Sequence, residues 1–140
     1  MEITPYLFFN GTCEAAMTRY AEVFRVPAPE FVRVSDMPPE DQAAMAGAPA
    51  AAVMNCALVL GGAMIMASDD VSGDSPGMAG ASIHIGLPSV AEAHRVFVEL
   101  AEGGRVGMAM GETFWTPAFG TLTDRFGIRW MVSVAEGAAG

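Results

Sequence analysis

Hydrophobic and polar positions follow the same order twice along the chain. In each copy a short apolar run predicts a strand, an amphipathic stretch predicts a helix, and three further apolar runs predict strands. The first copy covers residues 3–68 and the second covers residues 82–134, with a connection rich in Gly, Ser and Asp at residues 69–81. The pattern therefore predicts an α+β fold of two βαβββ modules that form a single domain over residues 1–140.

The first module is predicted to open with a strand at residues 3–9 and a helix capped by Asn10 or Thr12. Two hairpin strands are expected at residues 52–60 and 63–68, joined by Gly61-Gly62. The helix carries apolar side chains at helical spacing: Cys13, Ala16, Met17, Tyr20 and Phe24. A further strand is expected at residues 31–34, before a loop at residues 35–51 with one helical turn around residues 39–45. Two interpretations of this loop stay open, a lid and a passive connector.

The second module opens with a predicted strand at residues 82–86. Ser89 and Glu92 have the spacing of a capping box for the helix that follows. Arg95 and Glu99 are spaced for an ion pair one helical turn apart. The last three strands are expected at residues 105–110, 118–123 and 128–134, with a turn at residues 124–127.

Composition narrows the class of protein. Hydrophobic residues make up 52% of the chain and charged residues only 16%, which is typical of a folded domain. The net charge of −9 argues against nucleic acid or an anionic membrane as partner. No long apolar run predicts a membrane span, and no signal peptide is visible at the N-terminus, so a cytoplasmic location is expected. Cys13 and Cys56 are predicted to be buried apolar side chains without a disulfide or a metal.

Several motifs resemble one known family. Residues 111–115 read Gly-Glu-Thr-Phe-Trp, and residues 119–131 read Phe-Gly-Thr-Leu-Thr-Asp-Arg-Phe-Gly-Ile-Arg-Trp-Met. Residues 5–11 and 64–69 fit the same pattern. Together they resemble PhnB-like proteins of the vicinal oxygen chelate superfamily, which includes glyoxalase I, extradiol dioxygenases and bleomycin-resistance proteins. The resemblance implies two βαβββ modules paired into a curled mixed sheet around a shared cavity, and a homodimer.

The same resemblance bears on metals and cofactors. The metal enzymes of the superfamily place His, Gln or Glu at four strand positions, which fall here near Pro5, near Met66, on Ser82 and on Met131. These side chains do not suit a hard divalent cation, so neither a metal nor a cofactor is expected. Some members of the subgroup are labelled demethylubiquinone methyltransferases. The sequence has no glycine-rich strand-to-helix turn for S-adenosylmethionine, so that activity is not predicted.

Most of the candidate ligand-binding residues lie in the second module, and Asn55 and Met66 lie in the first. His84 shares a strand face with Ser82, and it is either a hydrogen-bonding or acid–base group in the cavity or a core histidine. Glu112, Phe114 and Trp115 occupy a connection between strands. They either line the mouth of the cavity or serve the fold, with Glu112 accepting backbone hydrogen bonds and Trp115 closing one end of the sheet.

The remaining candidates are one polar residue in an apolar strand and a set of methionines. Asn55 is a polar residue in an apolar strand, and it either lines the cavity or faces a dimer partner. Methionines give an adaptable apolar lining: Met64, Met66, Met108, Met110 and Met131. Whether the protein is an enzyme stays open. The favoured hypothesis is a binder of a small, mostly apolar or aromatic molecule. The alternatives are a metal-dependent enzyme of the superfamily with relocated ligands that include His84, and a structural homodimer whose cavity its own side chains fill.

Overall fold

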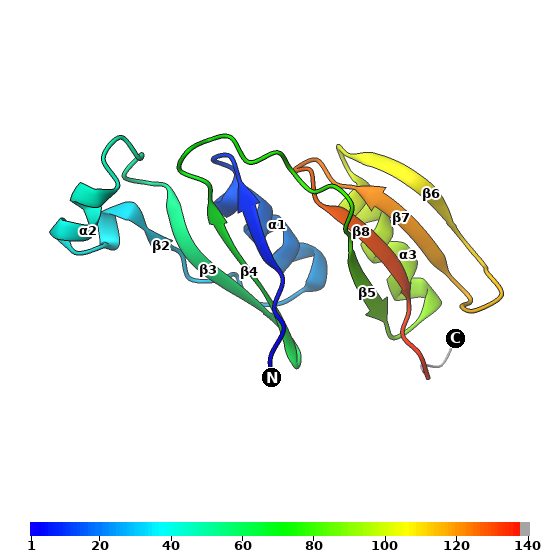
Figure 1. Ribbon diagram of the computed structural model, residues 1–140. Coiled ribbons are helices and arrows are strands. Elements are labelled where there is room, and N and C mark those ends of the chain that lie inside the picture. The colour runs from blue at the N-terminus through cyan, green and yellow to red at the C-terminus, as the bar shows by residue number, and fades with distance from the viewer. Residues whose placement is uncertain (138–140) are drawn as a thin grey trace. The chain divides into compact units, whose positions relative to one another are not determined.

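The computed structural model describes residues 1–137 and divides the chain into two compact units, which meet in sequence between Pro76 and Gly77. Each unit consists of a four-stranded mixed sheet with one long helix against one of its faces (Figure 1). The repeat predicted from the sequence is therefore confirmed as two sheets with the same order of elements.

Unit 1 has the strand order β1-β4-β3-β2, with β1 parallel to β4 and the other neighbours antiparallel. The elements are β1 (Tyr6–Phe9), α1 (Cys13–Phe24), β2 (Val32–Arg33), the 3₁₀ turn η1 (Val34–Asp36), α2 (Pro39–Ala44), β3 (Val53–Leu60) and β4 (Ala63–Asp69). The hairpin across Gly61-Gly62 is confirmed, because Leu60 pairs with Ala63.

Unit 2 has the equivalent order β5-β8-β7-β6, again with one parallel pair, β5 with β8. The elements are β5 (Ile83–Leu87), α3 (Val90–Ala101), β6 (Arg105–Gly111), β7 (Phe119–Thr123) and β8 (Arg129–Val134). The predicted Ser89 cap is confirmed, since its hydroxyl accepts a hydrogen bond from the Glu92 amide. Arg95 Nη1 lies 2.5 Å from Glu99 Oε2, as the spacing predicts.

The start of α1 departs from the prediction. Neither Asn10 nor Thr12 caps this helix: Thr12 makes no side-chain cap, and Asn10 exchanges two hydrogen bonds with Ser75. Asp69 takes the place of a local cap, with Oδ1 accepting from the Cys13 amide and Oδ2 from the Val53 amide. A residue 56 positions away thus satisfies the helix N-terminus, which no local pattern predicts.

The segment at residues 35–51 is more ordered than the predicted loop. It contains η1 and α2, and backbone hydrogen bonds to residues 50 and 52 tie it back to the start of β3. Gln42 also donates to the carbonyl oxygen of Met37. The predicted helical turn around residues 39–45 is confirmed, although α2 buries none of its side chains.

Asp124 organises the turn between β7 and β8. Its Oδ1 accepts hydrogen bonds from the amides of Phe126 and Ile128, and its Oδ2 accepts from Trp130 Nε1 at 2.9 Å. The carboxylate is buried, as is Trp130. Short polar residues often stabilise turns, and Asp124 does so here. Its carboxylate also accepts a hydrogen bond from a core side chain, Trp130.

We predict that Asp124→Ala lowers the free energy of unfolding by about 3 kcal/mol, because three N–H donors lose a buried, charged acceptor. Both tryptophans lie in unit 2, so urea unfolding followed by tryptophan fluorescence reports on this unit. The control is Asp74→Ala, an exposed aspartate whose loss should change the free energy by less than about 0.5 kcal/mol. Equal stability of the two variants would contradict the role assigned to Asp124.

Candidate functional site

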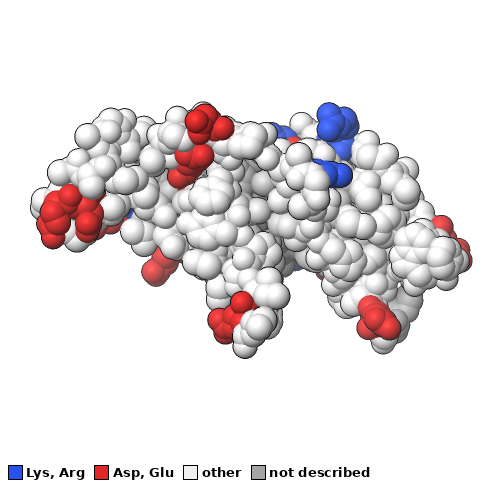
Figure 2. Space-filling view, viewed as in Figure 1, with Lys and Arg blue, Asp and Glu red and all other residues white. Residues whose placement is uncertain are grey.

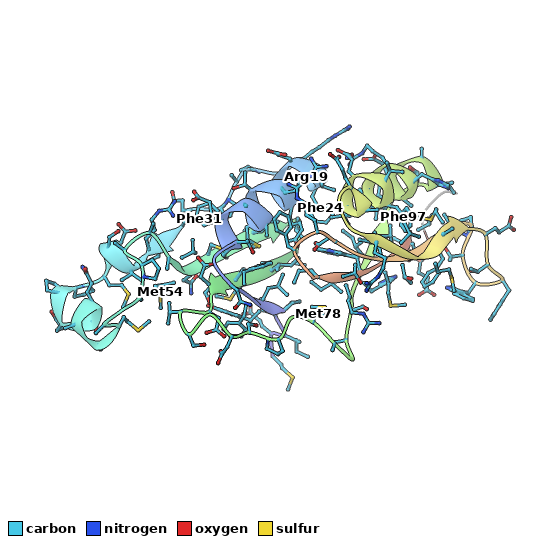
Figure 3. All side chains as sticks on the ribbon, turned by 90° about the horizontal axis from the view of Figure 1, so that it is seen from above. Arg19, Phe24, Phe31, Met54, Met78 and Phe97 are labelled. Atoms are coloured by element: carbon cyan, nitrogen blue, oxygen red, sulfur yellow. The ribbon has the colours of Figure 1, made fainter. Side chains whose placement is uncertain are left out.

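Each sheet has one face under its helix and one face that its own unit leaves uncovered. For unit 2, Figure 2 shows the uncovered side of the sheet, where white atoms predominate. In unit 2, the side chains under α3 include Leu122, Trp130 and Val132, all buried. Phe97 of α3 lies so close to Gly120 that a Cβ there would sit 2.7 Å from the ring (Figure 3). We call the opposite side the open face of unit 2.

The strand register arranges the open face in three rows, because residues paired across strands point to the same side. The first row contains Arg105, Thr123 and Arg129, the second contains Met108, Thr121, Met131 and His84, and the third contains Gly111, Phe119, Ser133 and Gly86. Ser82 directly precedes β5 and has the parity of His84, so it continues the first row.

His84 belongs to the second row and forms a side-chain hydrogen bond with Ser133 in the third row. Its Nε2 lies 2.7 Å from the Ser133 hydroxyl, and its backbone pairs with Met131 on the neighbouring strand. His84 is exposed whereas Ser133 is buried, so the imidazole is the accessible member of the pair. This arrangement offers a hydrogen-bonding group in an otherwise apolar stretch of sheet.

Aromatic side chains border the third row. Trp115 packs edge-to-face against Phe119, with ring centroids 5.4 Å apart, and against Phe114 at 4.8 Å. Trp115 is 58% exposed and Phe114 is 97% exposed. Within its own unit Trp115 therefore keeps most of its surface exposed, and its role at the end of the fold stays a prediction.

The connection that carries these rings is held by threonines. The amide of Thr113 donates to the carbonyl oxygen of Thr116, and the amide of Thr116 donates to the Thr113 hydroxyl. Glu112 is exposed and accepts no hydrogen bond among residues 1–137. The hypothesis that Glu112 ties down the connection is thus wrong, and its side chain is available to solvent.

On β8, sequence reasoning missed two residues of the open face, Ser133 and Arg129. Both have the parity of Met131 on β8, so the alternation that placed Met131 would also have placed them. Arg129 is half-buried, between the buried side chains of Ile128 and Trp130. The family resemblance places only one metal-ligand position on this strand, at Met131, so it gives no signal for Arg129 or Ser133.

Unit 1 has an open face of its own, which contains the other two candidates. Met66 lies between Tyr6 and Ala57, and Asn55 is exposed on β3 beside Val32. The side chains exposed here are almost all apolar: Tyr6, Phe8, Val32, Val59 and Met64. The candidate residues therefore divide between the units, with Met66 and Asn55 in unit 1 and the other six in unit 2.

The donor set does not fit the metal centre of the superfamily. Tyr6, one residue beyond Pro5, pairs with Met66, and His84, two residues beyond Ser82, pairs with Met131. These pairs offer one imidazole and no carboxylate, too little for a hard divalent cation. Within residues 1–137, no three His, Cys, Asp or Glu side chains come together in a way that would hold a metal ion.

Comparison with known proteins places this fold in a family. Protein YjdN of Escherichia coli K12 is 30% identical over 97% of both chains. The crystal structure of PA1353 from Pseudomonas aeruginosa is 39% identical, with a TM-score of 0.82 over 96% of this chain and 97% of that one. The PhnB protein of Bacillus cereus is 25% identical, with a TM-score of 0.75 over 96% of this chain and all of that one.

A more distant structure shows the wider fold. A member of the glyoxalase/bleomycin resistance protein/dioxygenase superfamily from Sphaerobacter thermophilus is 15% identical, with a TM-score of 0.55 over 96% of this chain and 98% of that one. In residues 1–137, none of the helices combines the length and the apolar character that crossing a bilayer requires.

The family described as 3-demethylubiquinone-9 3-methyltransferase matches residues 1–133, nearly the whole chain. The protein therefore belongs to this PhnB-like family, and it shares its fold with the superfamily member from Sphaerobacter thermophilus.

Proposed function

We propose that the protein binds a small, mostly apolar or aromatic molecule on the open face of unit 2. The observation that carries this proposal is the His84–Ser133 pair, with Nε2 and Oγ 2.7 Å apart, at an exposed position between methionines and aromatic rings. A ligand site is typically apolar with a few polar groups that fix orientation, and this face has that composition.

Each part of the face has a role in such binding. Met108 and Met131 present flexible thioethers, which adapt to irregular apolar shapes. Trp115 and Phe114 present exposed rings that offer a flat surface for stacking. His84 supplies a hydrogen bond to a hydroxyl or carbonyl group of the ligand.

The observed side chains support binding better than they support a metal-dependent reaction or methyl transfer. A metal-dependent reaction needs a ligand set that the paired residues Tyr6, Met66, His84 and Met131 do not provide. Methyl transfer, which the family description mentions, would need a place for S-adenosylmethionine. The turn before α1 contains one glycine, Gly11, and the turn before α3 contains none, so neither resembles a nucleotide-binding loop.

A structural role for the open face makes a different prediction from binding. If the methionines and rings only filled space, no added molecule would stabilise the folded state. A ligand that binds only the folded state raises the unfolding temperature with the logarithm of its concentration. Biphenyl-4-methanol is a suitable neutral probe, because it joins two rings to one hydroxyl group.

We predict that His84→Ala weakens binding of biphenyl-4-methanol about 5-fold while the protein stays folded, because one exposed hydrogen bond is lost. Isothermal titration calorimetry measures the affinity, and circular dichroism measures the fold. The matched control is His94→Ala, which removes the other histidine from the exposed side of α3. Equal losses in both variants, or no stabilisation of the parent protein by the probe, would overturn the proposal.

A further inference from the structure

The arginines of this chain differ in whether they form an ion pair with an acidic side chain. All seven basic residues are Arg, against sixteen acidic residues. Arg19, Arg33 and Arg95 form ion pairs with glutamates. Arg105 and Arg129 form none among residues 1–137, although acidic side chains outnumber basic ones by more than two to one. Two cations without an internal partner therefore remain in the first row of the open face.

These two arginines lie at the same end of one sheet. Arg105 pairs with Thr123 on β7, and Thr123 pairs in turn with Arg129 on β8. In Figure 2, blue atoms gather over one end of unit 2, whereas red atoms lie at its margins. The open face thus runs from a cationic row, across methionines, to an aromatic row.

We propose that the ligand of the open face carries a carboxylate, held at the cationic row by Arg129 with help from Arg105. This inference rests on the proposed function, because it names the chemical class of the molecule that the same face binds. An arginine guanidinium pairs with a carboxylate through two parallel hydrogen bonds, which gives both strength and orientation. The remainder of the ligand then covers the methionines and reaches the rings.

The dimensions of a sheet set the size of this ligand. The first and third rows are four residues apart along β8, which corresponds to about 13 Å of extended strand. Arg129 and His84 lie on neighbouring strands and two residues apart in register, so their Cα atoms are roughly 8 Å apart. A carboxylate bound to Arg129 is therefore within reach of the His84 imidazole, and two aromatic rings fill the remaining length.

Biphenyl-4-carboxylate and its neutral analogue biphenyl-4-methanol test this assignment. Titration calorimetry should show that the carboxylate binds at least about 10-fold more tightly than the alcohol to the parent protein. In Arg129→Gln the carboxylate should lose about that factor, while the affinity for the alcohol stays within about 2-fold. The control Arg19→Gln removes the same charge from α1 in unit 1 and should leave both affinities unchanged.

The possible results separate this inference from the proposed function. If neither probe binds the parent protein, the proposed function itself fails. If both bind equally well, or if Arg129→Gln weakens both probes alike, binding to the open face stands and the carboxylate assignment is wrong. If Arg19→Gln lost as much affinity for the carboxylate as Arg129→Gln, the effect would come from net charge alone. That result would also overturn the assignment.

A second observation concerns the two cysteines of unit 1. Cys13 at the start of α1 and Cys56 on β3 are both buried, and their Sγ atoms lie 3.7 Å apart. The hydrogen bond with Cys56 and burial raise the pKa of the Cys13 thiol. The contact with Cys13 lowers the pKa of the Cys56 thiol. Each sulfur thus lies in direct contact with the other, in the position that a resolving thiol needs.

We infer that Cys13 and Cys56 are a dithiol that a hydroperoxide closes into an internal disulfide between α1 and β3. The thiolate of one cysteine attacks the peroxide oxygen, which breaks the O–O bond, forms a sulfenic acid and releases the alcohol of the hydroperoxide, or water when the oxidant is hydrogen peroxide. The other thiol then attacks the sulfenic sulfur, which forms the S–S bond and releases one water. Two thiols are oxidised, and one hydroperoxide is reduced.

Intact-mass spectrometry after treatment with hydrogen peroxide tests this reaction. The protein should lose about 2 Da, regain it with dithiothreitol, and yield a peptide that joins Cys13 to Cys56. The bridge spans 43 residues, so the oxidised protein should unfold at a temperature higher by on the order of 5 °C or more. Cys13→Ser and Cys56→Ser should each gain oxygen or remain reduced instead.

The peptide map of the parent protein decides the question even if either variant fails to fold. Stepwise addition of oxygen to one cysteine without a bridge, or thiols that stay reduced until the protein unfolds, would overturn the inference.

Discussion

One long helix covers only one face of a four-stranded sheet, and this constraint determines what each unit can do. The helix α3 buries Leu122, Trp130 and Val132 against its own side of the sheet. Alternation along the strands then sends Arg129, Met131 and Ser133 to the other side. A fold of this kind has an uncovered sheet face in each unit, where side chains are free to serve recognition.

Buried carboxylates give each unit its rigidity. Asp69 binds the first amide of α1 and the start of β3, and Asp124 binds the β7–β8 turn and the Trp130 ring nitrogen. Arg129 lies next to Trp130 in sequence, so the hydrogen bonds of Asp124 also fix the strand that carries the cationic row. A hydrogen-bonded core network of this kind positions a surface group without contacting any ligand.

Much of the fold follows from the sequence, because it depends on local patterns. The two βαβββ repeats, the Gly61-Gly62 hairpin and the Ser89 cap each rest on neighbouring residues. The Asp69 cap of α1 does not, since it joins residues distant in sequence.

The candidate site was predicted less completely. Alternation placed His84 on the same strand face as Ser82, but strand register was needed to pair it with Met131 and to bring Ser133 within hydrogen-bonding distance. Strand register depends on which strands pair, and a single sequence does not reveal the pairing. The shared cavity between the modules, the homodimer and the cytoplasmic location stay predictions.

The proposed function requires the open face of unit 2 to be the binding surface. Methyl NMR of protein labelled at methionine tests it most directly, with biphenyl-4-carboxylate as the titrant. Met108 and Met131 belong to the open face, whereas Met17 of α1 in unit 1 is fully buried. We expect the Met108 and Met131 resonances to shift together with one saturation curve while Met17 stays in place. Shifts confined to methionines outside the open face, or none at saturating probe, would contradict the account.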